Sequence, residues 1–336
     1  MRAAIYRGPG EITVEEVPRP EIESPTDAIV RVTHTAVCGS DLWFYRGQSD
    51  REEGSRVGHE PMGIVEEVGD DVRSVEPGDR VFAPFVISCG RCEFCRKGLH
   101  TSCVNGDSWG GDNGGGQGEY VRATEADGTL VRVPDRHADD EDTLEAILPL
   151  TDVMGTGHHA AVSAGVSEGD TCIVVGDGAV GLCGVLAARR LGAERIIAMG
   201  HHEDRLELAE SFGATETIAA RGQDAVDAAD DLTNGGANHV LECVGAASAM
   251  ETAIDVCRPG GTVATSVSRT ASTTPDWTCS RCSATTSRST AASHRFVPTP
   301  TNCWPMCCRA HSTRRRSSRK RRPRRRSRGV SGDGRA

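Results

Sequence analysis

The amino-acid sequence predicts an α/β protein in which a partly open β-barrel is followed by a doubly wound parallel sheet. Up to about Pro134, short alternating or apolar runs are separated by Gly, Pro and Asp, which is typical of β structure. From Gly165 onward, apolar runs alternate with helix-forming segments, which indicates β-α-β units. A chain of 336 residues is long enough for about two domains. We expect residues 1–150 to form the first domain and residues 151–267 an incomplete second one.

Three runs in the first part have the length and composition of strands, at residues 28–33, 63–68 and 80–85. The sequence Pro77-Gly78-Asp79 forms a turn that leads into the third run. A helix is expected to begin in residues 141–148, where the β-type pattern ends. These elements predict the barrel and the connection that leaves it.

The segment at residues 171–205 has the pattern strand, glycine turn, helix, strand. Apolar runs at residues 171–175 and 195–199 enclose a G-x-G-x-x-G pattern and a helix expected at 179–191. In such a turn the first glycine allows the tight turn, the second lets a pyrophosphate approach the backbone, and the third lets the helix pack on the strand. The first N–H groups of the helix face that phosphate. The candidate cofactor-binding residues here are Gly176, Gly178, Val180 and Gly181.

A glycine-rich turn without a ligand is the alternative interpretation of this pattern, and the flanking strand and helix favour a dinucleotide site. Further strands are expected at residues 216–219, 240–244 and 262–267, with a helix at 205–212 between the second strand and the third. These elements extend the parallel sheet.

The charge of the chain is divided unevenly along its length. The net charge is −10, but residues 268–336 hold 17 Lys and Arg against 2 Asp and Glu, whereas residues 1–267 hold 21 against 46. An acidic, lysine-poor surface is typical of proteins from a high-salt cytoplasm and equally of an acidic enzyme from a GC-rich genome. We expect a soluble, cytoplasmic protein that does not enter a membrane, because neither an apolar run of transmembrane length nor a signal peptide is found in the sequence.

Four of the 14 cysteines lie in one short segment with the spacing C-x2-C-x2-C-x7-C. In a cytosolic chain, cysteines at such spacing indicate a metal site or free thiols rather than disulfides. Four thiolates in one loop suit a tetrahedral structural zinc ion. An iron–sulfur cluster or unligated thiols are the alternatives. The candidate ligands are Cys89, Cys92, Cys95 and Cys103.

A second set of metal-ligating residue types is dispersed: Cys38, His59 with Glu60, and Asp152. A catalytic zinc ion takes three protein ligands and keeps one position open. One thiolate, one imidazole and one carboxylate or thiol would meet that need. Each residue alone also fits a structural role, as a buried cysteine, a core histidine or a helix-capping aspartate.

The motifs Cys38-Gly-Ser-Asp and Gly58-His59-Glu60, the four-cysteine segment and the Gly176–Gly181 turn occur in one order in this chain. In this order and spacing the sequence resembles the zinc-dependent alcohol dehydrogenases of the medium-chain dehydrogenase/reductase family, over residues 1 to about 267. The segment around Asp152 is most similar to the subgroup in which Asp is the third ligand of the catalytic zinc. The resemblance implies a GroES-like catalytic domain followed by a Rossmann domain, with an alcohol or carbonyl substrate between them. The family forms homo-oligomers, an expectation that is weaker for a chain with this C-terminus.

The resemblance also implies a role for each matching residue. Cys38, His59 and Asp152 would hold a catalytic zinc ion, the second of two per chain. Ser40 would take the alcohol proton, and Asp41 would orient His59. Glu60 would approach the metal during ligand exchange. Zinc would act as a Lewis acid toward the substrate oxygen while hydride passes to the nicotinamide.

The end of the second strand bears on the cofactor. An NAD-binding site of this kind has Asp or Glu about 20 residues beyond the glycine turn, which binds the ribose 2′-OH. Here Met199 is followed by Gly200, which is expected to leave room for a 2′-phosphate. His201, His202 and Arg205 would supply positive charge. The sequence therefore predicts a preference for NADP over NAD.

The resemblance ends near residue 267. Residues 268–336 lack apolar periodicity and are rich in Arg, Ser and Thr, so we expect disorder. We interpret the segment as the product of a reading-frame slip near codon 267 and expect it to impair activity. The alternative is a dehydrogenase-like scaffold with a basic nucleic-acid-binding tail around residues 314–328. That tail lacks interleaved aromatic residues on which bases could stack, which argues against nucleic acid as a partner.

Overall fold

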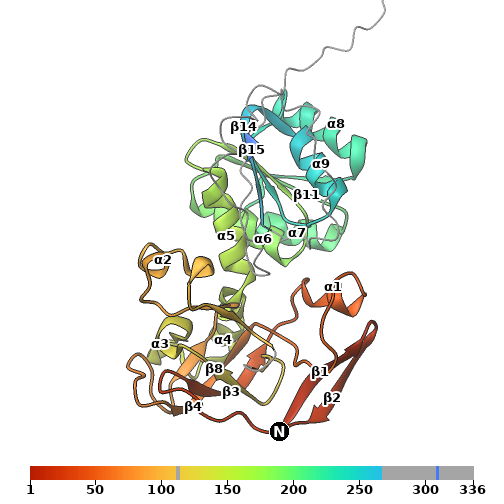
Figure 1. Ribbon diagram of the computed structural model, residues 1–336. Helices are drawn as coiled ribbons and strands as arrows, with labels where there is room; N and C mark the ends of the chain where they lie inside the picture. The colour runs from red at the N-terminus through yellow and green to blue at the C-terminus, as the bar shows by residue number, and fades with distance from the viewer. Residues whose placement is uncertain (111–113, 267–307, 310–336) are drawn as a thin grey trace, which may run out of the picture.

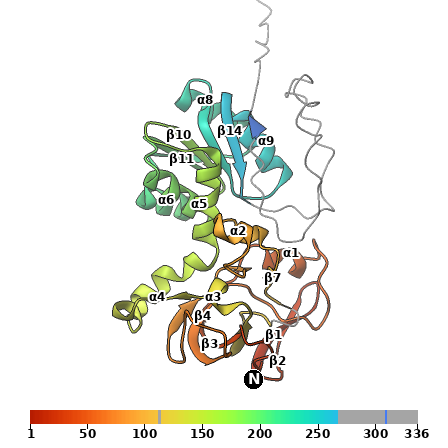
Figure 2. The ribbon, with the colours of Figure 1, turned by 60° about the vertical axis from the view of Figure 1, so that its left-hand side comes forward.

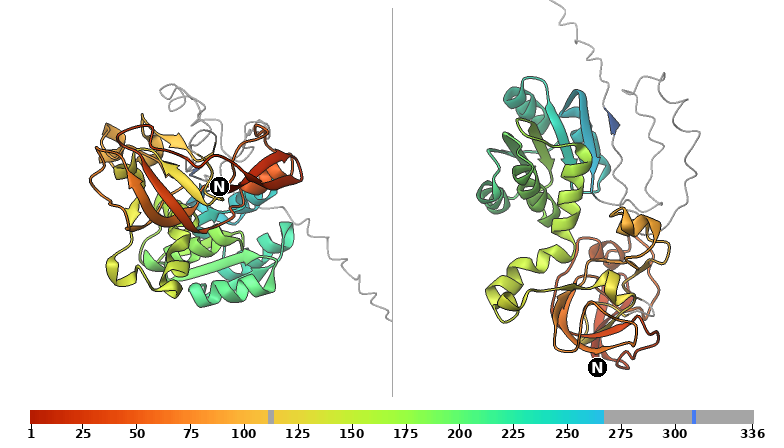
Figure 3. Two further views of the ribbon diagram at one scale, coloured as in Figure 1. Left: turned by 90° about the horizontal axis from the view of Figure 1, so that it is seen from below. Right: turned by 90° about the vertical axis from the view of Figure 1, so that its left-hand side faces the viewer.

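The chain folds into a β-rich N-terminal part and an α/β C-terminal part (Figure 1). The computed structural model describes residues 1–110, 114–266 and 308–309. Helix α4 (Glu141–Ile147) lies beside the β-rich part, and α5 (Val153–Ala164) continues from there along the parallel sheet of the other part (Figure 3). The two parts confirm the expected fold class of a barrel-like sheet followed by a doubly wound sheet.

The β-rich part is built around an antiparallel five-stranded sheet in the order β8-β3-β4-β5-β9. Val30, Val65 and Val121 lie in its buried core. The strands of this sheet are β3 (Ala28–Thr35), β4 (Pro61–Val68), β5 (Arg80–Phe82), β8 (Tyr120–Ala123) and β9 (Val131–Arg132). Two antiparallel pairs accompany it, β1 (Arg2–Gly8) with β2 (Glu11–Glu16), and β6 (Val86–Ile87) with β7 (Asp107–Ser108).

The helices of this part are short. They are α1 (Asp41–Tyr45), α2 (Glu93–Arg96) and α3 (Ala126–Thr129), with 3-10 turns at η1 (His100–Ser102), η3 (Asp135–His137) and η4 (Leu148–Thr151). Helix α4 is longer, and the side chain of its N-cap residue Asp140 accepts a hydrogen bond from the backbone N–H of Thr143. The turn η4 matters most for the site, because it leads directly into Asp152 and α5.

The C-terminal part contains a sheet in the order β12-β11-β10-β13-β14-β15. The first five of these strands are parallel and follow the 3-2-1-4-5 order of a dinucleotide-binding sheet. They are β10 (Thr171–Val175), β11 (Arg195–Gly200), β12 (Glu216–Ala219), β13 (Ala237–Glu242) and β14 (Cys257–Thr265). Helices cover both faces of this sheet, so its strands are buried on both sides.

Successive side chains of these strands enter two different cores. On β10, Cys172 and Val174 face one core, and Ile173 and Val175 face the other. Helices α5, α6 (Ala179–Arg190) and α7 (Glu203–Phe212) close the first core. Helices α8 (Gly222–Thr233) and α9 (Ala247–Asp255) close the second, and Figure 2 shows α6 and α9 on opposite faces of the sheet. Continuous apolar runs are therefore required in these strands.

Most of the expected elements are present, with shifted ends. The strand expected at 171–175 matches β10, and the strand expected at 80–85 ends at Phe82, shortly before Pro84. The strand expected at 240–244 begins earlier, at Ala237, where β13 pairs with β14. We expected no regular structure beyond residue 267, but β15 (Cys308–Arg309) pairs antiparallel with β14. The rest of residues 268–336, including the basic stretch, lies outside the described residues.

The glycine turn between β10 and α6 depends on close packing. Gly176 has φ = +117°, a conformation that favours glycine, and a Cβ atom on Gly181 would lie 2.8 Å from the carbonyl carbon of Gly176. We therefore expect Gly181→Ala to lower the free energy of unfolding by about 1–3 kcal/mol. Gly178→Ala is the matched control, because a Cβ atom there meets nothing within 4 Å. Equal urea unfolding midpoints for the two variants would contradict this prediction.

Candidate active site

Three side chains that are far apart in the sequence meet in the structure. Cys38 follows β3, His59 precedes β4, and Asp152 lies at the start of α5. The Sγ atom of Cys38 is 3.5 Å from Asp152 Oδ2, and His59 Nε2 is 3.2 Å from the same oxygen. Together with Glu60, these residues offer donor atoms that all lie within 4.8 Å of one another. The structure thus brings the candidate catalytic zinc ligands into one cluster.

Two buried carboxylates support this cluster. Asp41 Oδ1 lies 3.5 Å from His59 Nδ1, and Asp41 Oδ2 accepts a hydrogen bond from the Cys38 backbone. Glu60 Oε2 accepts a hydrogen bond of 3.0 Å from the Thr151 hydroxyl. Glu60 Oε1 has no hydrogen-bond partner among the described residues and lies 3.9 Å from His59 Nε2. Asp41 is therefore placed to orient His59, and Glu60 presents a free oxygen to the cluster.

The carboxylates of the cluster favour a positive charge beside them. Burial by itself lowers the pKa of His59, but its hydrogen bonds with Asp152 and Asp41 outweigh this effect and raise the pKa to about 12. Burial also raises the pKa of Glu60. A thiol, an imidazole and a carboxylate around one point match the three-ligand set of a catalytic zinc ion. The residues present therefore fit zinc.

The neighbouring residues of the cluster come from two turns. Ser40 is exposed in the turn before α1, and its backbone N–H points at Cys38 Sγ at 3.5 Å. Thr151 ends η4 and fixes Glu60, a role that reasoning from the sequence missed. The sequence feature that could have indicated this role is a hydroxyl residue directly before the candidate ligand Asp152. Ser40 and Thr151, which are far apart in the sequence, thus both lie next to the cluster.

The four cysteines of the second candidate metal site gather in one loop. Their sulfur atoms form contacts of 3.4–3.9 Å, and all four lie within 4.8 Å of one another. Hydrogen bonds from the backbones of Cys95 and Val104 lower the pKa of Cys92 to about 6, whereas burial raises the pKa of Cys95 to about 12. A cation is needed for all four groups to ionise together. This closed set of thiols fits a structural zinc ion.

The glycine turn places the start of α6 at the carboxyl end of β10. Gly178 is the N-cap of α6 and provides no side-chain hydrogen bond, so in the described part of the chain the first N–H groups of the helix lack a side-chain cap. Uncapped N–H groups at a helix N-terminus form a site for an anion such as a pyrophosphate. Val180 is partly buried and packs against the core beneath α6. The Val180 side chain thus packs the start of α6 against this core.

The space beside Gly200 is filled, although we expected it to be free for a 2′-phosphate. A Cβ atom on Gly200 would lie 2.6 Å from Cγ of Asp177, the second residue of the glycine turn. That carboxylate accepts hydrogen bonds of 2.8 and 2.9 Å from the backbones of His201 and His202. In this structure Asp177 thus fills the space that Gly200 was expected to leave free, and the role of Gly200 in cofactor choice stays a prediction. Reasoning from the sequence missed Asp177, although an acid inside a phosphate-binding turn is itself a signal.

The expected positive side chains surround this carboxylate. His202 Nδ1 lies 3.0 Å from Asp177 Oδ2, and Arg205 Nη1 lies 3.8 Å from Asp177 Oδ1. The rings of His201 and His202 are 3.7 Å apart, and His201 Nδ1 is 2.8 Å from Arg221 Nη2. The second strand thus ends in a mixed cluster of one acid and several bases rather than in a purely basic one.

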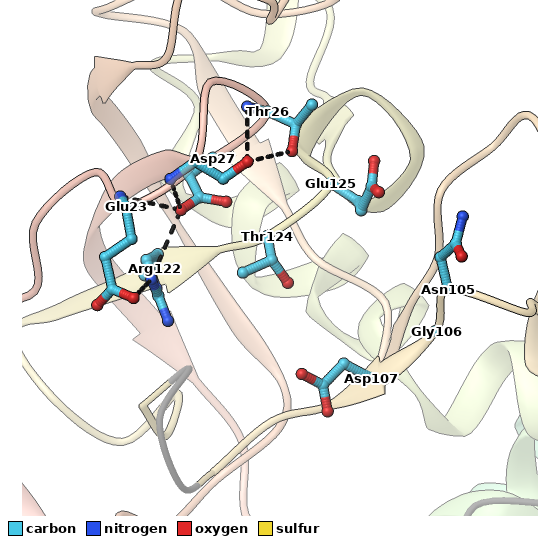
Figure 4. A pocket seen from close by; sticks show the side chains of 10 residues that line it. Glu23, Thr26, Asp27, Asn105, Gly106, Asp107, Arg122, Thr124 and Glu125 are labelled. Carbon is cyan, nitrogen blue, oxygen red and sulfur yellow. Dashed lines mark hydrogen bonds and ion pairs between the residues drawn. The ribbon is translucent and has the colours of Figure 1, made fainter.

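A polar pocket on the β-rich part lies beside the four-cysteine set, because Asn105 and Gly106 line it. It has a volume of about 480 Å³, and Figure 4 shows its lining side chains. Asp27 and Arg122 are buried there, and Arg122 forms ion pairs with Glu23 and, at 3.6 Å, with Asp27. The lining residues include neither a thiol nor an imidazole. The pocket lining therefore offers neither of the thiol and imidazole ligand types of the two candidate metal sites.

The fold and the site define a class of protein. A parallel dinucleotide-binding sheet, a barrel-like domain, one closed set of four cysteines and one open Cys-His-Asp set together are typical of a zinc-dependent dehydrogenase. None of the described helices is long and apolar enough to cross a membrane.

Comparison with known proteins agrees with this class. Residues 24–135 match the alcohol dehydrogenase GroES-like domain, and residues 179–281 match the zinc-binding dehydrogenase family. The chain is 37% identical over 273 residues to zinc-type alcohol dehydrogenase B of Aspergillus flavus, covering 78% of this chain and 62% of that protein. The chain thus spans less than two thirds of the length of this relative.

Solved structures show the same relationship. Alcohol dehydrogenase TADH from Thermus sp. ATN1 is 34% identical, with a TM-score of 0.72 over 81% of this chain and 79% of that one. A zinc-binding dehydrogenase from Sinorhizobium meliloti 1021, bound to NADP, is 29% identical, with a TM-score of 0.66 over 79% and 76%. The chain belongs to the zinc-dependent alcohol dehydrogenases of the medium-chain dehydrogenase/reductase family, a family of oxidoreductases.

Proposed function

We propose that this chain transfers hydride between an alcohol and a nicotinamide cofactor, with the corresponding aldehyde or ketone as the other partner. The observation that carries the proposal is the position of α5. This helix begins directly after Asp152, which belongs to the candidate metal cluster, and at Gly157 it packs closely against α6, which begins at the glycine turn. A Cβ atom on Gly157 would lie 2.6 Å from the backbone nitrogen of Gly184. One helix pair therefore links the metal cluster to the dinucleotide turn.

The position of each side chain in the candidate active site suggests a separate role for it. When bound, zinc supplies Lewis acidity toward the substrate oxygen, and the nicotinamide supplies the hydride acceptor or donor. Cys38, His59 and Asp152 would hold the metal, and Asp41 keeps the imidazole oriented through its contact with Nδ1. Ser40, in the exposed turn beside Cys38, would take the alcohol proton.

Glu60 would serve the open coordination position. Its Oε2 is fixed by Thr151, while Oε1 has no partner among the described residues and is directed by the fold toward the cluster. A buried carboxylate oxygen without a partner is costly, so such an oxygen indicates a role in binding. Glu60 would approach the metal when substrate and water exchange.

A second metal ion, held by Cys89, Cys92, Cys95 and Cys103, would stabilise the loop around α2.

The cofactor preference remains a prediction. The side chains of His202 and Arg205 support NADP, as the sequence suggested, whereas the filled space beside Gly200 does not. The alternative function, nucleic-acid binding by the basic tail, falls on residues outside the described part of the chain.

The proposal is tested by measuring metal and activity on the same preparation. We expect two zinc ions per chain by elemental analysis, and alcohol-dependent reduction of a nicotinamide cofactor followed by the absorbance of the reduced form. Removal of zinc with a chelator should abolish the reaction, and added zinc should restore it. Less than one zinc per chain in metal-replete protein, or activity that persists after chelation, would contradict the proposal.

A further inference from the structure

Asp177 is the residue of the glycine turn that reaches the end of the neighbouring strand. Strands β10 and β11 pair in parallel, with Val175 opposite Met199, so the turns that follow them lie side by side. The Asp177 side chain crosses this gap and is 8% exposed. One oxygen, Oδ2, accepts three hydrogen bonds, from the backbones of His201 and His202 and from the His202 ring.

The Asp177 carboxylate occupies the position that a different acidic residue has in a typical dinucleotide site. The acid that binds the adenosine ribose normally stands at the end of the second strand. Here that position is Gly200, and Asp177 fills the space where the side chain of residue 200 would begin. An acidic group is therefore present at the ribose position, but it comes from the first turn instead of the second strand.

Asp177 also uses the groups that would otherwise hold a phosphate. Two consecutive backbone N–H groups at the start of α7, those of His201 and His202, form an anion-binding arrangement. Burial opposes ionisation of Asp177, but the hydrogen bonds from His201 and His202 outweigh it and lower the pKa to about 2. The anion-binding site is thus already filled by an anion of the protein itself.

We propose that Asp177 selects NAD over NADP, opposite to the preference that the sequence predicts. A ribose 2′-OH can donate a hydrogen bond to Asp177 Oδ1, whose contact with Arg205 is long at 3.8 Å. A 2′-phosphate would meet a negative charge and find the His201 and His202 N–H groups occupied. This inference rests on the proposed function, because it requires that the glycine turn binds a dinucleotide.

The basic side chains around Asp177 determine what its removal should do to cofactor binding. Arg205 and Arg221 carry positive charge, and His202 contacts the carboxylate directly. With Asp177 in place these groups compensate its charge. Without it, the two freed N–H groups and the arginines form a site suited to a 2′-phosphate. Loss of the acid should therefore reverse the preference and not merely weaken binding of NAD.

The test measures cofactor binding and needs no turnover. NADH and NADPH are titrated separately into the full-length chain, and the dissociation constants are obtained from the fluorescence of the bound cofactor. We expect the unaltered protein to bind NADH about tenfold or more tightly than NADPH. Asp177→Asn removes the negative charge, although the amide oxygen can still accept the backbone N–H groups. Because Arg205 and Arg221 are then no longer compensated, NADPH should bind about tenfold or more tightly than in the unaltered protein.

Asp170→Asn is the matched control. Asp170 lies at the opposite end of β10, where it accepts hydrogen bonds from the Ser167 backbone and contacts His239. This variant should keep the NADH preference unchanged. If Asp177→Asn does not fold, as judged by circular dichroism, Asp177→Ser is measured in its place, and the unaltered protein still gives the first comparison.

The outcomes separate this inference from the proposed function. Tighter binding of NADPH by the unaltered protein, or an unchanged preference in the Asp177 variant that folds, overturns the inference and leaves the dehydrogenase proposal intact. Binding of neither cofactor overturns both. Selective NADH binding without zinc-dependent alcohol oxidation supports the inference and contradicts the proposed zinc chemistry.

Discussion

Asp152→Asn is expected to lower kcat for alcohol oxidation by about 100-fold or more. The carboxylate is the proposed anionic ligand at the start of α5, and its Oδ2 lies 3.5 Å from Cys38 Sγ and 3.2 Å from His59 Nε2. Changes to groups that merely support metal ligands commonly cost about 10- to 100-fold in metal affinity or activity, so loss of a ligand charge should cost at least as much. The rate is measured from the appearance of reduced cofactor, and bound zinc by elemental analysis.

Asp140→Asn provides the control for this variant. Asp140 caps α4 at the surface, and Asn is an equally good N-cap, so activity and zinc content should not change. Binding of NADH should be equal in both variants, because the dinucleotide turn is untouched. Full activity in Asp152→Asn would show that Asp152 is not a ligand and that the cluster holds its metal through other groups.

Cys95→Ser is expected to reduce bound zinc from two ions per chain to one and to lower Tm by about 5 °C or more. Cys95 is buried and lies within 4.8 Å of three other thiols, so a lost thiolate opens a site that is closed in the native loop. Structural zinc contributes folding energy directly, and each kcal/mol lost moves Tm of a domain of this size by about 2–4 °C. Thermal unfolding followed by circular dichroism gives the shift.

The control is Cys257→Ser, a change of the same kind in the buried core of the other part of the chain. That variant loses packing but keeps both zinc ions. A chelator should therefore lower Tm of Cys257→Ser by more than it lowers Tm of Cys95→Ser, which has already lost one ion. Equal zinc contents in the two variants would contradict a structural zinc ion at this loop.

Local patterns explain most of what could be predicted. The strand at residues 171–175 and the glycine turn depend on neighbours in the sequence, and the structure places both as expected. The four cysteines around α2 are likewise close in the sequence, so their spacing alone indicated a common site. By contrast, the meeting of Cys38, His59 and Asp152 depends on how two separate parts fold together. That set was indicated by a family resemblance and not by spacing.

The features that reasoning from the sequence missed depend on contacts between separate segments. The space beside Gly200 depends on the register of β10 and β11, which lets Asp177 reach across from another turn. The pairing of β14 with Cys308–Arg309 joins segments more than 40 residues apart in the sequence, and periodicity gives no signal for it. In both cases the deciding contact lies between segments whose distance in space is not set by local composition.

The close packing of α5 on α6 has a mechanical consequence. Because Gly157 brings the two helix backbones together, Asp152 at the start of α5 is fixed to the frame of the parallel sheet. Cys38 and His59 belong to the frame of the β-rich part. Thr151, directly before Asp152, is bonded to Glu60 and to the backbone N–H of Phe85 in the β-rich part, so Asp152 lies at the junction of the two parts. A divalent ion held by Cys38, His59 and Asp152 would therefore act as a clamp, and the rigidity of the whole molecule would depend on metal occupancy.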